Sequence, residues 1–248
     1  MNRRDIIFSE KDECVEKFVF NESVANVFPD MIKRSVPGYV NLISLIGVIG
    51  SHFAQDNTNI YDLGCSLGAA SASFLSCFQS ENCTLYAVDN SESMLSHCKE
   101  HLTGFIDKIN LKISPSDIRD IDINNASVVI MNFTLQFLPL EDRLDMIRNI
   151  YLGLNPGGVL ILSEKILPDN KIDTELQTIL HHQFKRANGY SELEIAGKRS
   201  ALENVLIAES LKTHFERLKH AGFEYIHHWQ KCLNFSSILA IKDDIKAK

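Results

Sequence analysis

From residue 58 onward, short apolar runs alternate with helix-like segments, and this alternation constrains the fold more than any other feature of the sequence. Five runs of five residues each are mainly apolar: 59–63, 84–88, 109–113, 127–131 and 159–163. Most of them lack the polar–apolar alternation of a half-exposed strand. Buried strands separated by helices are typical of a parallel sheet that is covered on both faces. The sequence therefore predicts an α/β fold.

The segments between and after these runs carry helix signals. Residues 69–78 are rich in small side chains, Ser91 is a good N-cap for a helix to about Leu102, and a helix over 139–154 stops at the 155–158 turn. After a helix at about 207–221, residues 223–230 and 233–241 are expected to form a hairpin at the sheet edge. We expect a mostly parallel seven-stranded sheet with helices on both faces and an antiparallel edge strand.

Two regions depart from this rhythm. Residues 168–204 are helical and polar, and we interpret them as an insertion above the active face. Residues 1–57 contain aromatic tracts, expected to pack as an arm or lid, and a helix that opens at Pro37-Gly38. The predicted division is therefore an N-terminal arm with helices covering the site, 1–57, and an α/β domain, 58–248, that carries the helical insertion at about 168–204.

Composition narrows the classes of partner. The 248 residues carry a formal net charge of −7, which disfavours direct nucleic-acid binding. The six cysteines are scattered without C-x-x-C or zinc-type spacing, so we expect reduced thiols, a cytoplasmic location and no metal. The longest apolar run, 40–53, is interrupted by polar residues and is too short to span a bilayer.

Candidate binding residues fall where the predicted strands end, which is where open parallel sheets bind ligands. Asp62-x-Gly64-x-Ser66-x-Gly68 follows the first strand and opens a helix. Gly64 permits a tight turn and Gly68 permits close helix–strand packing. Asp89 ends the second strand, 25 residues after Gly64, and an acidic side chain there can accept hydrogen bonds from a ribose.

A glycine loop alone is weak evidence, because a tight turn chosen for packing explains it equally well. The acid at the second strand end favours a nucleoside. A dinucleotide site would keep G-x-G-x-x-G, whereas here Asp62 would repel a pyrophosphate and is able to pair with an amino group. The pattern thus fits a nucleoside that bears an amino acid better than NAD.

At this point the chain resembles the class I S-adenosylmethionine-dependent methyltransferases, and within them the branch of carboxy-S-adenosyl-L-methionine synthases. The segments outside the common fold, at 28–39 and 184–204, are the most specific for the branch. The resemblance covers nearly the whole chain after the first 20 residues and is carried by 27–32, 34–39, 61–70 (YDLGCSLGAA), 89–91, 117–120, 132–137, 153–158, 163–165, 184–195 (FKRANGYSELEI), 198–200 and 202–204. Ser66 stands where many methyltransferases have glycine, but the branch accepts CSLG.

The resemblance implies the reaction, the ligands and the site residues. It implies that the protein converts S-adenosylmethionine and prephenate into carboxy-S-adenosylmethionine and phenylpyruvate. It also implies that another enzyme uses the carboxylated product to modify the wobble uridine of tRNA. It further implies a homodimer. The contacts it implies for the cofactor are Tyr39, Gly64, Cys65, Ser66, Asp89, Asn90, Asp117, Ile118, Asn132 and Arg199. Arg199 would act catalytically by pairing with the new carboxylate, a role that spacing alone does not assign.

Charge and chemistry leave some roles open. Although the net charge of the chain is negative, a local cluster of cationic side chains suits a dianionic substrate: Lys165, Lys185, Arg186, Lys198 and Arg199. His181 and His182 point to different helix faces, so we interpret them as structural or surface residues. No general base is assigned, because the substrate itself can supply the proton acceptor. A conventional small-molecule methyltransferase and a non-catalytic binding protein remain as alternatives.

Overall fold

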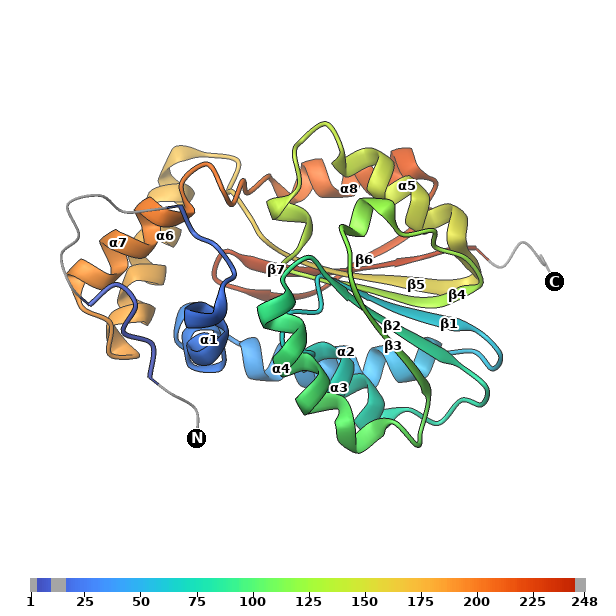
Figure 1. The fold of residues 1–248 in the computed structure, drawn as a ribbon. Coiled ribbons are helices and arrows are strands. Elements are labelled where there is room, and N and C mark those ends of the chain that lie inside the picture. Colours follow the sequence, from blue (N-terminus) through green and yellow to red (C-terminus); the bar gives the residue numbers. More distant parts are fainter. Residues whose placement is uncertain (1–3, 10–16, 244–248) are drawn as a thin grey trace.

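The computed structural model describes residues 4–9 and 17–243, and its centre is one seven-stranded sheet with the strand order β3-β2-β1-β4-β5-β7-β6 (Figure 1). The first five strands are mutually parallel. The strands are β1 (Asn59–Leu63), β2 (Thr84–Asp89), β3 (Asn110–Pro115), β4 (Ala126–Asn132), β5 (Leu154–Lys165), β6 (Tyr225–Cys232) and β7 (Phe235–Ile241). The predicted mostly parallel α/β sheet is confirmed.

The predicted hairpin at the sheet edge is formed by β6 and β7. The strand that runs antiparallel to its neighbours is β7, which lies between β5 and β6, one position inside the edge at which the sequence predicts it. Burial explains this order. Ile238 and Ala240 of β7 are buried, whereas β6 is exposed or half-exposed along its whole length, so the more apolar strand takes the interior position.

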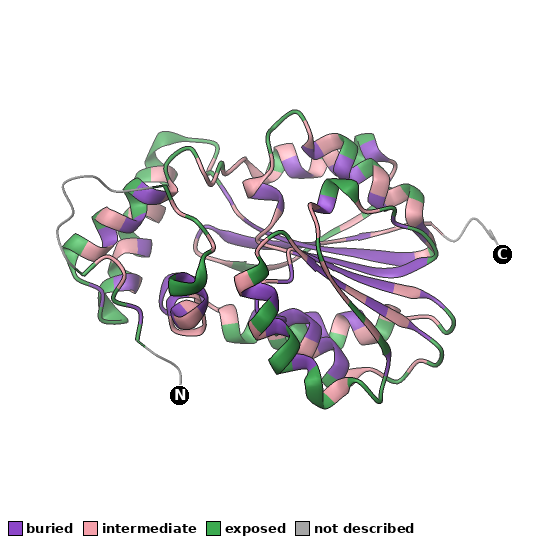
Figure 2. Cartoon of the chain, viewed as in Figure 1, coloured by how far each residue is buried: buried purple, intermediate pink, exposed green. Residues whose placement is uncertain are grey.

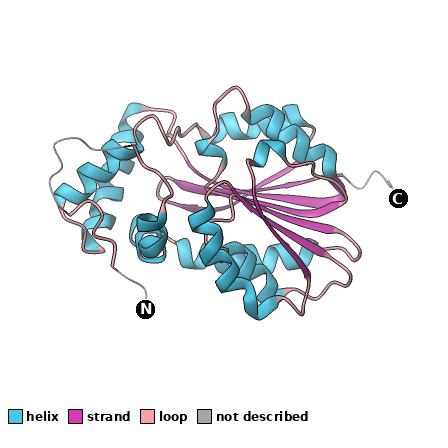
Figure 3. Ribbon diagram, in the orientation of Figure 1, coloured by secondary structure: helices cyan, strands magenta, loops and turns pink. Residues whose placement is uncertain are grey.

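Helices cover both faces of the sheet (Figure 3), and Figure 2 shows buried residues along the central strands between them. On one face lie α2 (Tyr39–Phe53), α3 (Ala69–Cys77) and α4 (Glu92–Leu102), and on the other lie α5 (Arg143–Gly153) and α8 (Leu211–Ala221). Successive strand residues serve opposite cores. Ile60 packs with the α2–α3 side and Tyr61 with the α5–α8 side. Strands apolar on both faces therefore follow directly from this layering.

Helix α1 (Glu22–Ser35) holds part of the aromatic tract that is expected to form an arm or lid. Asn21 caps it, since the side-chain oxygen accepts a hydrogen bond from the Val24 amide at 3.1 Å. Phe20, just before the cap, contacts Phe28 of α1 and Phe137 at ring-centroid distances of 6.2 and 5.4 Å. These aromatic contacts tie the start of α1 to the loop that follows β4.

The polar segment 168–204 forms two helices, α6 (Lys171–Ala187) and α7 (Glu192–Leu202), which lie beyond the ends of the strands and beside α1 (Figure 1). Asn170 caps α6, and Ser191 with Glu194 forms a capping box on α7. The helical character predicted for this segment is confirmed. The described part of the chain also contains three single 3-10 turns: η1 (Thr103–Phe105), η2 (Ile118–Asp120) and η3 (Leu135–Phe137).

The arm formed by residues 4–9 joins α1 to this helical pair through one buried residue, Asp5. Its amide donates to Asp30 Oδ2 at 2.8 Å, and its carbonyl accepts from Arg34 Nη1 at 3.0 Å. Its carboxylate accepts the hydroxyl hydrogen of Tyr190, at the start of the α7 region. A buried carboxylate with these partners anchors the arm firmly.

Within the described residues, no single helix is long and apolar enough to cross a membrane. Helices α1 and α2 pass that test together by length and composition only, and they are bent by 99° at the break between them.

Candidate active site

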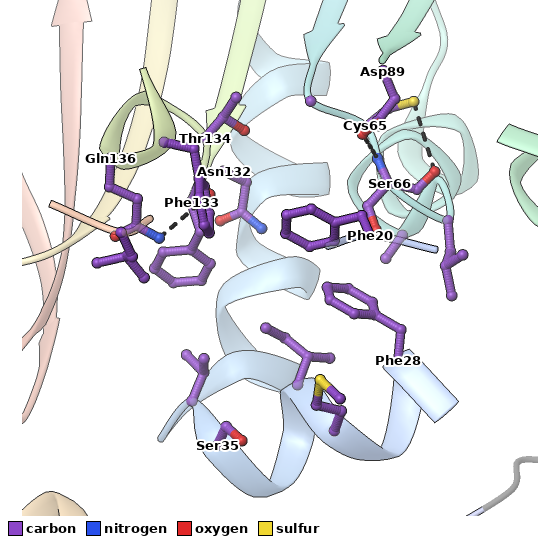
Figure 4. A pocket seen from close by; sticks show the side chains of 18 of the residues that line it. Phe20, Phe28, Ser35, Cys65, Ser66, Asp89, Asn132, Phe133, Thr134 and Gln136 are labelled. Atoms are coloured by element: carbon purple, nitrogen blue, oxygen red, sulfur yellow. Dashed lines mark hydrogen bonds between the residues drawn. The ribbon is translucent and has the colours of Figure 1, made fainter. Parts of the chain in front are cut away.

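A cavity of about 560 Å³ lies at the carboxyl ends of the parallel strands, closed on the far side by α1, α6 and α7. Its volume is in the range that small-molecule sites occupy. Of the ten predicted site residues, nine line it: Tyr39, Gly64, Cys65, Ser66, Asp89, Asn90, Asp117, Ile118 and Asn132. In Figure 4, Asp89 and Ser66 lie on one side of this space, and Phe28 and Ser35 of α1 lie opposite. The residues after β4 lie on another side: Asn132, Phe133, Thr134 and Gln136.

The turn after β1 is built around Gly64. The amides of Gly64 and Cys65 both donate to the carbonyl of Val88, at 2.8 and 2.9 Å, which folds the chain back over β2. Gly64 has φ +78, and a Cβ there would lie 2.4 Å from the Thr134 hydroxyl oxygen. Only glycine therefore both adopts this positive φ without strain and leaves room for the Thr134 side chain.

The predicted role of Gly68 needs a correction. The sequence predicts that it brings helix and strand together, but a Cβ on Gly68 would lie 2.8 Å from the sulfur of Cys98 in α4. The close contact is thus between the start of α3 and α4. Its φ of +77 again requires the left-handed region.

Asp89 is held in place by the loops on either side of it. One carboxylate oxygen accepts from the Ser66 amide and the other from the Ser91 amide, both at 2.9 Å. Burial raises the pKa of this carboxyl group, and the two amide bonds oppose that rise. Each oxygen keeps room for a further donor, because a carboxylate offers about four acceptor positions. Asp89 therefore combines a fixed position with free acceptor capacity, as a ribose requires.

Asp62 and Tyr39 both line the inner wall. Asp62 Oδ2 accepts from the amide and the hydroxyl of Ser71, at 3.1 and 2.6 Å. Burial raises the pKa of Asp62 to about 6. Burial and the nearby Asp62 charge also raise the pKa of Tyr39 above its usual value, so its phenol stays neutral at neutral pH. This wall is acidic overall and suits a ligand with an amino group.

Asn132 and Asp117 are placed differently from each other. The side-chain oxygen of Asn132, at the end of β4, is buried and has no hydrogen-bond partner among the described residues. An unpaired buried acceptor on a cavity wall fits a ligand that donates to it. The Asp117 carboxylate, at the rim, instead accepts from the Arg119 guanidinium at 2.7 Å, and this bond lowers its pKa. Asp117 is thus largely engaged by the protein itself.

The predicted cationic cluster is split by the structure. Lys165, Lys185 and Lys198 line the cavity. Arg186 lies on the surface and pairs with Glu192. Arg199 is exposed and lines a separate shallow hollow beside His182 and Glu203. Neighbouring residues of one helix point in different directions, so Lys198 faces inward while Arg199 faces outward. Arg199 is therefore the one predicted site residue that the single chain does not bring to the cavity.

Some wall residues are not apparent from the sequence. His181, interpreted above as a structural or surface residue, is buried, lines the cavity and bonds to the Ser35 carbonyl at 2.7 Å. That carbonyl can only accept, so Nε2 carries the hydrogen. Ser35, Thr134 and Gln136 also line the cavity. The four-residue spacing of His181 and Lys185 on one helix is the available signal, since it places both on the same face.

No group of three or more His, Cys, Asp or Glu that could hold a metal ion occurs in the part of the chain that the structure describes.

Comparisons with known proteins bear on the fold and the family of this chain. The family model "Methyltransferase domain" matches residues 60–158. Among solved structures, a putative O-methyltransferase from Nostoc punctiforme superposes with a TM-score of 0.63 at 15% identity, over 89% of this chain and 59% of that one. Human N-acetylserotonin methyltransferase in complex with SAM gives 0.59 at 16% identity, over 90% and 55%. At such low identity these likenesses show the fold alone.

Curated relatives are much more similar in sequence. The carboxy-S-adenosyl-L-methionine synthase of Actinobacillus pleuropneumoniae serotype 5b is 50% identical over 96% of this chain and 99% of that protein. The enzyme of the same name from Salmonella typhimurium is 50% identical over the full length of both chains. The chain belongs to the carboxy-S-adenosyl-L-methionine synthase family.

Proposed function

We propose that the protein converts S-adenosyl-L-methionine and prephenate into carboxy-S-adenosyl-L-methionine and phenylpyruvate. The observation that carries this proposal is the division of one cavity into two chemically opposite halves. Acidic side chains Asp62 and Asp89 line the wall at the ends of β1 and β2, and three lysines line the side at β5, α6 and α7. A cationic amino-acid nucleoside fits the first half, and a dicarboxylate fits the second.

The reaction balances without an added acid or oxidant. Prephenate loses one carboxylate as carbon dioxide and its ring hydroxyl as hydroxide, which leaves phenylpyruvate. The positive sulfur of the bound nucleoside acidifies its methyl group, so that the methyl carbon gives up a proton and takes up the carbon dioxide. The proton and the hydroxide form water, so the proton acceptor comes from the substrate.

The protein's own contribution is to hold the two substrates together and to exclude water. Phe20 and Phe28 cover the cavity from the arm and α1 (Figure 4). The segment 17–21 before α1 is held at two points, since the Ser91 hydroxyl donates to the Phe20 carbonyl at 2.5 Å and the Phe18 amide donates to the Ala201 carbonyl at 2.9 Å. A closed, mostly apolar lid keeps carbon dioxide in the cavity and keeps water away from a reactive carbon.

For the cofactor contacts we keep the ten residues inferred above. Asp89 with its free acceptor positions would hold the ribose, and the unpaired oxygen of Asn132 would accept from the amino-acid part. Arg199 remains our candidate for pairing with the new carboxylate. Because it is exposed and lies outside the cavity of its own chain, it would have to turn inward or come from a second copy of the chain.

A homodimer is part of the proposal. Helix α6 exposes a stripe of apolar side chains at helical spacing, with Ile172 78%, Leu176 48% and Ile179 56% exposed. A contiguous apolar face of this kind marks an interaction surface. The same helix carries His181 and Lys185 on its inner side, so an interface there would adjoin the site.

We further propose that the product serves as a carboxymethyl donor for tRNA wobble-uridine modification by a separate enzyme, in the cytoplasm. The net charge of −7 supports the view that tRNA itself is not bound here. All five cysteines within the described residues are free thiols, as expected in a reducing compartment. A gel shift with unmodified tRNA at physiological salt should show no specific complex, and a sub-micromolar complex would refute this part.

The decisive experiment is mass spectrometry on the purified protein incubated with S-adenosylmethionine and prephenate. We expect the cofactor to gain the mass of carbon dioxide and phenylpyruvate to appear in equal amount. A methylated acceptor and S-adenosylhomocysteine would instead identify a conventional methyltransferase. The cofactor that co-purifies with the protein should be the carboxylated one.

A further inference from the structure

Two lysines in the cavity lack any counter-charge. Lys185 is only 8% exposed and Lys165 is half-buried, yet neither side-chain nitrogen has a hydrogen bond or ion pair within the described residues. Burial lowers the pKa of Lys185 to about 8, and burial also lowers that of Lys165. Unpaired buried ammonium groups are costly. Such a pair persists where a ligand supplies the missing negative charge.

The fold brings these lysines to one place from distant parts of the chain. Lys165, at the end of β5, pairs across the sheet with Phe235 of β7. The Phe235 ring packs edge-on against His181 at 5.2 Å between centroids. Lys185 lies one helical turn after His181 on the same face of α6. The sheet end and the insertion therefore meet through the Phe235–His181 contact, and both lysines face the cavity there.

The other charged groups nearby already have roles. Lys198 donates to the Ser35 hydroxyl at 2.9 Å and lies 3.9 Å from the Asp5 carboxylate. His181 stays neutral, because burial and the two lysines lower its pKa to about 3. The acidic residues of the cavity lie on the opposite wall, where Asp62 and Asp89 accept backbone amides. A fourth lysine of the lining, Lys33, is exposed to solvent, and so is Arg199. Among the cations that line the cavity, Lys165 and Lys185 are therefore the two that are at least partly buried and have no partner within the described residues.

We propose that Lys165 and Lys185 form a carboxylate clamp that binds one carboxylate of the dicarboxylic substrate. The clamp deepens the proposed function and rests on it for the identity of that substrate. Lys198, held by Ser35 and Asp5, stays beside the clamp and does not close on the same carboxylate. Two point-like ammonium groups on separate elements fix the position of a carboxylate by approaching it from two sides.

If the two lysines are held ready for an anion, their unpaired charges destabilise the protein when no ligand is bound. Lysines with a purely structural role would stabilise it instead. Replacing Lys165 or Lys185 by Met removes a buried like-charge repulsion and keeps most of the side-chain volume. We expect each variant, without ligand, to melt about 2–4 °C higher than the wild type. Lys171→Met, an exposed position on the same helix, is the matched control and should leave the melting temperature unchanged. A lower melting temperature in both clamp variants overturns the proposal.

Binding supplies the second test. By calorimetry, prephenate affinity should fall about 30-fold or more in each clamp variant, the loss for truncating one side of a buried charge pair. Affinity for S-adenosyl-L-homocysteine should stay within about twofold, which shows that the acidic half is intact. Unchanged prephenate affinity, or a loss that falls on the carboxylated cofactor instead of prephenate, overturns the clamp.

A simple dianion separates the clamp from the proposed function. Malonate should raise the melting temperature of the wild type and of Lys171→Met, and should leave that of both clamp variants unchanged. If the wild type neither binds prephenate nor forms the carboxylated cofactor, the proposed function fails, while the malonate series still decides on the clamp. Equal malonate shifts in all four proteins, or no shift in the wild type, refute the clamp.

Discussion

The two halves of the cavity are built in different ways. At the ends of β1 and β2, Asp89 and Asp62 accept backbone amides from the turns and helix starts that directly follow these two strands, so the local chain there fixes their positions. On the insertion side, Lys165, Lys185 and Lys198 come from three separate elements, and two of them have no partner among the described residues. The acidic half is thus complete without ligand, whereas the cationic half is stabilised by what binds there.

The largest loss of ligand affinity should come from a substitution in the acidic half of the cavity. Asp89→Ala removes the acceptors of the Ser66 and Ser91 amides together with the proposed ribose contacts. Two hydrogen bonds to a charged group, each about 1.5–3 kcal/mol, imply a loss of about 3–6 kcal/mol in S-adenosylmethionine affinity. Calorimetric titration measures it, with the exposed Asp107→Ala as control. Unchanged affinity in Asp89→Ala would contradict the ribose placement.

This contrast also explains how much of the site can be predicted from the sequence. Strand ends can be located from the apolar runs, and parallel strands bring their ends to one edge, so the strand pattern alone assigns Gly64 and Asp89 to a common site. The packing partners of these residues cannot be assigned in this way. That Gly68 opposes Cys98 of α4 depends on the distance between two helices, which no local pattern encodes.

The cationic half is harder to predict for a physical reason. Lys185 and Arg186 look alike in the sequence, yet one faces the cavity and the other pairs with Glu192 on the surface. The rotation of α6 about its axis decides between them. His181 contacts Phe235, 54 positions later in the chain, and bonds to the Ser35 carbonyl, 146 positions earlier, so distant partners hold that rotation. The order of β6 and β7 likewise depends on which strand is better buried.

Arg199 tests whether the cationic half is complete in one chain. If it pairs with the new carboxylate, Arg199→Ala should weaken binding of the carboxylated cofactor by about 2–5 kcal/mol and that of S-adenosylmethionine very little. Arg199→Lys should restore only part of the loss, because an ammonium cannot make a planar two-point contact. The measurement is a paired set of dissociation constants, with the exposed Arg148→Ala as control.

Equal weakening of both cofactors would mean that Arg199 is structural, in line with its place outside the cavity of its own chain. The partner of the new carboxylate should then be sought first at Tyr39 and Lys198, which both line the cavity.

Substitution of Gly64, in the turn after β1, should destabilise the protein although this residue is only partly buried. Gly64→Ala places a methyl group within 2.5 Å of the Thr134 side chain and holds alanine at φ +78. The left-handed conformation costs about 1–2 kcal/mol and overpacking about 1–3, so we expect a loss of about 2–5 kcal/mol in the free energy of unfolding. Urea denaturation measures this loss, and Gly104→Ala, with nothing within 4 Å, should show no such effect.

Adding Thr134→Ala to Gly64→Ala separates the two causes, since it relieves the overlap and leaves the φ penalty in place. A double variant as unstable as Gly64→Ala alone would show that the overlap contributes nothing.

The smallest effect concerns the pH dependence of stability. It tests directly whether the cationic half of the cavity contains an unpaired charge that the acidic half lacks. Burial, with the charges of Lys165 and Arg199, lowers the pKa of Lys185 to about 8, from 10.5 in the unfolded chain. Between these two values the unfolded state binds more protons than the folded state, so the free energy of unfolding rises with pH there. Below pH 8 both states are protonated, and the destabilising contribution of Lys185 is constant.

The expected change is at most about 1.4 kcal/mol over one pH unit above pH 8, the limit for one titrating group. Glu164, whose pKa burial raises to about 8, and Lys198, whose pKa burial lowers to about 7, also contribute near this window. Both groups are present in Lys185→Met, so the difference between wild type and variant isolates Lys185. Urea denaturation at several pH values should give a flatter profile for the variant. Parallel profiles would mean that Lys185 has an ordinary pKa, and the unpaired charge that distinguishes the cationic half would then be absent.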